Sequence, residues 1–123
     1  MNEAQFISKL VKLTNGNPKA LSLMDDTATL GSGTIVNTDT TIEGVHILHG
    51  LNPKYIAYKA MARSVSDIFA KGGEVIGYFL NIILPKGFSA FDDFLQGFAE
   101  FTAVHKMDLL GGDTSVYGSD LII

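Results

Sequence analysis

Apolar residues recur at the spacing of an α-helix in three segments of this chain. The first segment is residues 2–13, and turn-forming residues follow it. The second begins after the N-cap residue Asn52 and ends at a pair of glycines, 72–73. The third follows Ser89, for which a capping box with Asp92 is predicted. The apolar positions are Phe6, Ile7, Leu10 and Val11; Ile56, Ala57, Ala60, Met61, Val65, Ile68 and Phe69; and Phe91, Phe94, Leu95, Phe98 and Phe101.

The segments between these helices are rich in β-branched and apolar residues. Residues 23–47 contain a glycine turn and predict a hairpin. Residues 74–85 are nearly all apolar, which predicts a strand covered on both faces. Two short strands are predicted at 107–114 and 119–123. Together these elements predict an α+β fold, with helices packed on a four-stranded, mostly antiparallel sheet.

Composition narrows the function classes. With 123 residues, 46% of them hydrophobic and 18% charged, the chain is expected to be one compact domain, residues 1–123. It has no apolar run long enough for a membrane span, so a cytoplasmic protein without membrane contacts is expected. The absence of cysteine excludes disulfides and thiolate zinc sites. A net charge of -4 without a basic cluster argues against a nucleic-acid partner.

Acidic residues stand beside small or hydroxyl residues in four places, "MDDTA", "NTDTT", "SVSDI" and "GGDTS". Carboxylate and hydroxyl oxygens are the ligands that Mg²⁺ prefers, and Mg²⁺ is commonly shared with substrate phosphates. The sequence therefore favours a site for Mg²⁺ and a nucleotide. Taken singly, each acid is better explained by a cap or a turn, and an Asx-turn is the alternative for Asp113.

Asp67 differs from the other acids because it falls well inside a predicted helix. Lys59, Arg63 and Asp67 follow one another at four-residue spacing, so a surface salt-bridge stripe is as plausible as a ligand role. Asp39 and Glu43 fall on one face of a predicted strand, roughly 13 Å apart, too far to share an ion unless a bulge intervenes. Using both would take several metal ions, or one metal ion and a substrate contact.

A zinc site is not expected at the two histidines of "HILH", His46 and His49, because the chain places no third nitrogen or sulfur ligand near them. His46 stands near Glu43 and could contact an organic substrate. The chain also lacks the G-x-x-x-x-G-K-[ST] phosphate loop and a complete dinucleotide fingerprint.

Three motifs in this order resemble those of thiamine-monophosphate kinases, a family in the aminoimidazole ribonucleotide synthetase-like superfamily. They are "NTDTTIEGVHI", "IAYKAMARSVSDIFAKGG" and the "LLGGDT" near the end, and the resemblance extends from about Met24 onward. It implies the superfamily's N-terminal α+β domain, whose sheets pair across a homodimer. It also implies transfer of the ATP γ-phosphoryl group to thiamine monophosphate, which gives thiamine diphosphate.

The resemblance also assigns residues to roles. It implies Mg²⁺ ligands at Asp25, Asp26, Thr38, Asp39, Asp67 and Asp113. It implies ATP contacts at Lys59, Gly112, Asp113 and Thr114, and substrate contacts at Glu43 and His46. No residue is assigned as a catalytic acid, base or nucleophile, because phosphoryl transfer depends mainly on positioning and charge neutralisation.

Three positions depart from the family pattern: Met24 replaces a glycine, Ser64 an asparagine and Lys71 a methionine. Members of the family continue into a second domain, so we expect the chain to be an N-terminal domain, as a designed fragment or a natural truncation, with weak activity or none alone. Two alternatives remain. One is another ATP-dependent member of the superfamily, such as selenophosphate synthetase or aminoimidazole ribonucleotide synthetase; the other is a non-catalytic dimerisation module.

Overall fold

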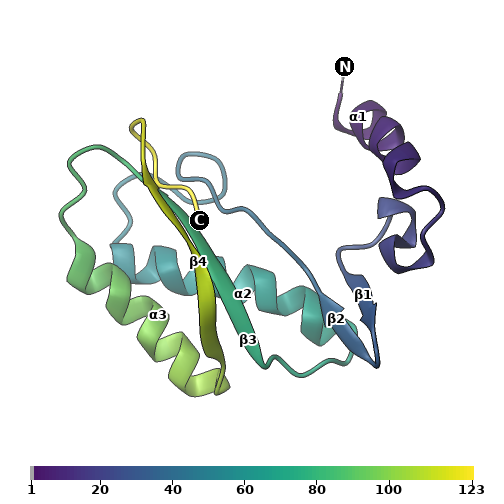
Figure 1. Cartoon of the computed structure of the whole chain (residues 1–123). Helices are drawn as coiled ribbons and strands as arrows, with labels where there is room; N and C mark the ends of the chain where they lie inside the picture. Colours follow the sequence, from purple (N-terminus) through teal and green to yellow (C-terminus); the bar gives the residue numbers. More distant parts are fainter. Residues whose placement is uncertain (1) are drawn as a thin grey trace.

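The computed structural model describes residues 2–123 and shows a large lobe joined to a smaller N-terminal lobe (Figure 1). In the large lobe, two long helices lie along strands β3 and β4. The smaller lobe contains the N-terminal helices and a short hairpin. The elements are α1 (Glu3–Leu10), the 3-10 helices η1 (Val11–Thr14) and η2 (Pro18–Leu23), β1 (Ala28–Gly31), β2 (Thr34–Val36), α2 (Pro53–Ala70), β3 (Gly77–Leu84), α3 (Phe91–His105) and β4 (Asp108–Val116).

The three predicted helices are present, with differences at their ends. Asn52 caps α2 by accepting a hydrogen bond from the Lys54 backbone N–H at 2.9 Å, as predicted. The first helix ends at Leu10, and a 3-10 helix continues the chain to Thr14. The capping box predicted at Ser89 is wrong, because Ala90 is the N-cap of α3 and no side chain caps it. Acidic residues in the first turn of α3 oppose the positive end of the helix dipole instead.

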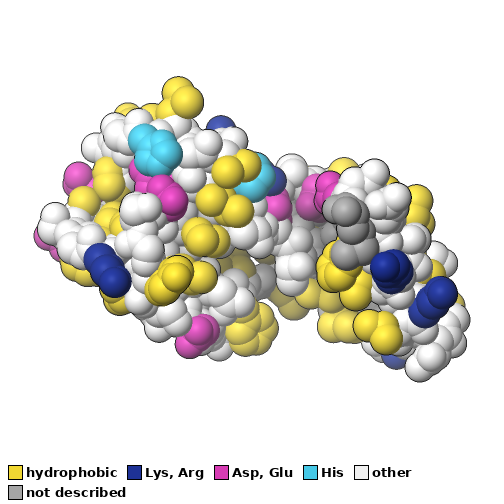
Figure 2. All heavy atoms as spheres, turned by 90° about the horizontal axis from the view of Figure 1, so that it is seen from above, with side chains coloured by type: hydrophobic (Ala, Val, Ile, Leu, Met, Phe, Trp, Pro, Cys, Tyr) yellow, Lys and Arg dark blue, Asp and Glu magenta, His cyan; other side chains and the backbone are white. Residues whose placement is uncertain are grey.

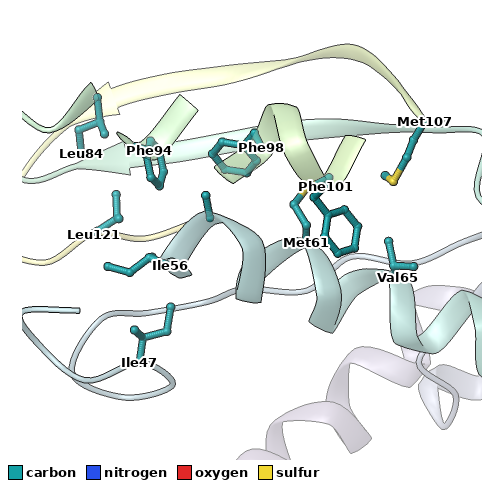
Figure 3. Packing of buried hydrophobic residues seen from close by; sticks show 11 residues of the cluster. Ile47, Ile56, Met61, Val65, Leu84, Phe94, Phe98, Phe101, Met107 and Leu121 are labelled. Carbon is teal, nitrogen blue, oxygen red and sulfur yellow. The ribbon is translucent and has the colours of Figure 1, made fainter. Parts of the chain in front are cut away.

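The core lies between α2, α3 and the inner face of β3 (Figure 3). Phe94, Phe98 and Phe101 are buried along one side of α3, and the rings of Phe94 and Phe98 meet edge to face with centroids 4.9 Å apart. Burial of these rings supplies much of the apolar stabilisation of the domain. Phe69 and Leu95, predicted on the same stripes, are instead 49% and 59% exposed.

The predicted four-stranded, mostly antiparallel sheet is wrong. β1 and β2 form one antiparallel pair, and β3 and β4 form a separate parallel pair. The physical reason is the connection: α3 joins β3 to β4, and a helical crossover brings the second strand back parallel to the first. Ile122 forms isolated antiparallel bridges with Ile83 and Ile42, so the predicted strand 119–123 is reduced to a bridge beside β3.

The prediction that β3 is covered on both faces is also wrong for this chain. Phe79 in β3 is 70% exposed, and every residue of β4 is exposed. The helices cover one face of the pair and leave the other open (Figure 1). None of the described helices is both long enough and apolar enough to cross a membrane.

Candidate active site

Four of the acidic residues singled out in the sequence line a cavity of about 650 Å³ where the smaller lobe meets α2. Figure 2 shows acidic and basic side chains near the narrow region that joins the two lobes. The hairpin β1–β2 supplies one wall and the C-terminal half of α2 supplies the other. The predicted ligands that line this cavity are Asp25, Asp26, Thr38, Asp39 and Asp67, together with Asn37, Arg63 and Ser66.

Asp25 lies in a tight turn before β1. The backbone N–H and the hydroxyl of Thr27 both donate to Asp25 Oδ1 at 2.9 Å. Lys71, at the C-terminal end of α2, donates from Nζ to Asp25 Oδ2 and forms an ion pair with it. These donors, Lys71 first, lower the pKa of Asp25 from 3.8 to about 2. Asp25 therefore stays ionised, and it lines the cavity while paired with the Lys71 ammonium group.

Asp39 is held by Arg63. The Arg63 Nη2 lies 3.1 Å from Asp39 Oδ1, while Nη1 donates to the Thr40 carbonyl and to the buried Thr41 hydroxyl at 3.3 and 3.2 Å. The residues between β2 and the Ile42 bridge form no strand, so the expected strand geometry of Asp39 and Glu43 is wrong. Arg63 fixes the position of Asp39 in place of a strand ladder.

Asp67 is held by Asn37, which lies just after β2. The Asn37 amide donates to Asp67 Oδ2 at 3.2 Å and to the Ser64 carbonyl at 2.7 Å, so it fastens the hairpin to α2. The alternative of a salt-bridge stripe from Lys59 through Arg63 to Asp67 is wrong. Arg63 pairs with Asp39, and Lys59 Nζ donates to the His46 carbonyl at 2.8 Å.

The oxygen-rich lining is chemically suited to Mg²⁺, which takes carboxylate and hydroxyl oxygens. Within residues 2–123, however, no three acidic or histidine side chains lie close enough together to hold an ion. Asp25, Asp39 and Asp67 each contact a different side chain of the protein, Lys71, Arg63 and Asn37 respectively. The oxygen ligands thus fit Mg²⁺ by their chemical type. In the structure, three of the carboxylates contact a lysine, an arginine and an asparagine side chain instead.

Asp113 and Thr114 lie in β4 and do not line the cavity. Asp113 is opposite Asn81 in the parallel pair, which removes the alternative of an Asx-turn. A Cβ on Gly112 would lie 1.9 Å from the Leu80 carbonyl oxygen, so the close approach that requires glycine here is that of β3. The family resemblance connects this glycine with a phosphate instead.

Glu43 and His46 also lie outside the cavity lining. The Leu121 N–H donates to Glu43 Oε2 at 3.2 Å, and the Ile42 N–H donates to His46 Nδ1 at 3.0 Å. His49 has a different partner, Asp120, at 3.0 Å. The two histidines therefore have separate contacts.

Sequence reasoning missed three residues that contact the carboxylates of the cavity. Asn37 carried no signal beyond its place in "NTDTT", and Arg63 was considered only for a salt-bridge stripe. Lys71 departs from the family pattern, and nothing in the linear sequence connects it with Asp25. All three contacts join segments between 24 and 46 residues apart, which a linear pattern does not reveal.

Comparisons with known proteins agree with the motifs. Residues 24–123 match the family described as AIR synthase related protein, N-terminal domain. A thiamine-monophosphate kinase of Caulobacter vibrioides is 35% identical over 98% of this chain and 36% of its own length. One of Bacillus subtilis is 37% identical over 79% of this chain and 31% of its own. The chain thus spans about a third of the length of these curated relatives.

Solved structures show the same fold. The structure described as "AaThiL complexed with AMPPCP and TMP" has a TM-score of 0.76 and 25% identity, over 92% of this chain and 40% of that one. A chain of the structure described as "Crystal structure of HypE-HypF complex" has a TM-score of 0.70 over 90% of this chain and 38% of that one. Its 19% identity makes this second likeness evidence for the fold alone.

Proposed function

We propose a kinase function for this chain, which belongs to the family of AIR synthase related proteins, N-terminal domain. In this proposal it is the nucleotide-binding part of a thiamine-monophosphate kinase. A phosphate oxygen of thiamine monophosphate attacks the γ-phosphorus of ATP, the bond from that phosphorus to the bridging oxygen breaks, and ADP leaves with thiamine diphosphate formed. The relatives named for this activity and the acidic cavity support the proposal.

The observation that carries the proposal is the charge of the cavity. Four carboxylates line it, and Arg63 and Lys71 are the basic side chains that pair with two of them, which leaves an excess of negative charge. A polyphosphate would be repelled from such a surface unless divalent cations entered with it. Mg²⁺ held by Asp25, Asp26, Thr38, Asp39 and Asp67 would neutralise the phosphates and the charge that develops during transfer.

The remaining assignments are part of the same proposal. Asp113 would be a further Mg²⁺ ligand, and Lys59, Gly112, Asp113 and Thr114 would contact ATP. Glu43 and His46 would face thiamine monophosphate. The active form would be a cytoplasmic homodimer in which the sheets of two copies pair. The exposed edge strand β4 supports this assembly, because unpaired strand edges favour association with another chain.

The test is ADP formation by the longest natural form of the protein with a panel of acceptors. The proposal predicts Mg²⁺-dependent ADP formation with thiamine monophosphate and none with selenide or with an aminoimidazole ribonucleotide precursor. Preference for either of the latter would move the protein to another ATP-dependent branch of the superfamily. AMPPCP binding without turnover of any acceptor would favour a non-catalytic module.

A further inference from the structure

Two basic side chains, Arg63 in α2 and Lys71 just after it, pair with carboxylates that line the acidic cavity. Arg63, Asp67 and Lys71 succeed one another at four-residue spacing, which places them along one side of the helix. Arg63 lines the cavity, and Lys71 reaches Asp25 on its wall. A cavity built from carboxylates thus contains cations supplied by the chain itself.

Each of these cations is paired with a carboxylate from the opposite wall. Lys71 pairs with Asp25, and Arg63 pairs with Asp39. The side chains are partly exposed, 43% for Lys71 and 32% for Arg63. Ion pairs with this much access to water are weak and can exchange partners without leaving a buried charge behind.

We propose that Lys71 and Arg63 are polyphosphate-binding residues, which hold Asp25 and Asp39 until a divalent cation and a polyphosphate enter the cavity together. This inference rests on the proposed function. A metal ion that enters alone must displace two cations that then have no anionic partner. A polyphosphate that enters alone meets unneutralised carboxylates.

When both enter, each displaced cation finds a new anionic partner. The metal ion takes the carboxylates, and the displaced lysine and arginine turn to the phosphate oxygens. Arginine suits this exchange because its planar guanidinium binds carboxylate and phosphate in the same geometry. The two ligands therefore strengthen each other's binding, and thermodynamic linkage makes the effect reciprocal.

Lys71 offers the sharpest test, because it replaces the methionine of the family pattern described above. Lys71→Met removes the cation and keeps a long, flexible side chain. Lys86→Met is the matched control, since Lys86 is exposed near the end of β3 and does not line the cavity. Arg63→Leu is a second variant that removes the other cation, and thermal melts check that each variant is folded.

Two probes are used. The binding of Mn²⁺ alone is measured by electron paramagnetic resonance, and the binding of the preformed complex of Mn²⁺ with inorganic triphosphate is measured by calorimetry. Lys71→Met should bind Mn²⁺ alone roughly fivefold more tightly and the Mn²⁺–triphosphate complex roughly fivefold more weakly, within the usual range of coupling between sites. Arg63→Leu should likewise strengthen the binding of Mn²⁺ alone and weaken the binding of the complex, and Lys86→Met should change neither affinity. A purely structural role for Lys71 would weaken both.

The outcomes separate this inference from the proposed function. If the wild-type chain does not bind the Mn²⁺–triphosphate complex, the proposed nucleotide site is wrong and the inference falls with it. If the wild type binds the complex but Lys71→Met and Arg63→Leu shift the two affinities in one direction or not at all, the inference alone is wrong. Opposite shifts in both variants support it.

Discussion

Asp25 is a residue whose neighbours set its ionisation, and this makes a prediction for acid stability. Its pKa is lowered from 3.8 to about 2, with Lys71 as the first cause. A carboxyl group whose pKa falls on folding stabilises the fold above the unfolded value, and that contribution is lost as pH falls from about 4 to about 2. The wild type should therefore lose more melting temperature between pH 5 and pH 2 than Asp25→Asn does. Equal losses would contradict the ion pair.

Asp113 makes a second prediction at this scale. Its side chain is exposed in β4, so Asp113→Asn should leave the melting temperature nearly unchanged. If it is a Mg²⁺ ligand as proposed, the affinity for Mg²⁺–AMPPCP measured by calorimetry should fall at least about tenfold. Mutating a residue that only hydrogen-bonds to a metal ligand already lowers metal affinity by about that factor. Unchanged affinity would leave Asp113 as an ordinary strand residue.

Residue types could be predicted from the sequence better than their partners. Of the acids next to small and hydroxyl residues, Asp25, Asp39 and Asp67 line one cavity. Their partners Lys71, Arg63 and Asn37 could not be assigned, because each contact depends on how the hairpin packs against α2. Pairing across distant segments is a property of the fold and leaves no local periodic signal.

At the scale of elements, the packing of α2 on α3 depends on one glycine. A Cβ at Gly97 would lie 2.2 Å from the Lys54 carbonyl oxygen and 2.9 Å from the Ala57 Cβ. Gly97→Ala should therefore lower the free energy of unfolding by about 1–3 kcal/mol or more, as overpacking does. Urea denaturation measures this. The sign of the change in the free energy of unfolding is decisive, because Gly→Ala in an uncrowded helix would instead raise that free energy, by at most about 1 kcal/mol.

Helices could be predicted well because periodicity and caps are local. Asn52 and the glycines after α2 mark both ends of that helix within a few residues. The arrangement of the sheet could not be predicted in the same way, because strand direction depends on the connection between strands and not on their composition. The order strand, helix, strand over residues 77–116 does contain the cue for a parallel pair, which the apolar runs alone obscured.

At the scale of the whole molecule, the exposed edge strand β4 predicts association. Leu109 is 58% exposed there, and such an edge favours pairing with a second copy. Light scattering at micromolar concentration should show a dimer, and Leu109→Lys should shift it toward monomer. Leu95→Lys is the matched control, because Leu95 is 59% exposed on α3, away from the strand edge. A monomeric wild type would contradict the proposed assembly.

The account rests on one claim, that the acidic cavity is the site for a metal–nucleotide complex. The most direct test is calorimetric binding of Mg²⁺–AMPPCP to the wild type, to Asp39→Asn and to Asp93→Asn. Asp39 lines the cavity, and Asp93 is an exposed acid in the first turn of α3. The account predicts binding that Asp39→Asn weakens at least about tenfold and Asp93→Asn leaves unchanged. Equal affinities in all three proteins, or no binding by the wild type, would contradict it.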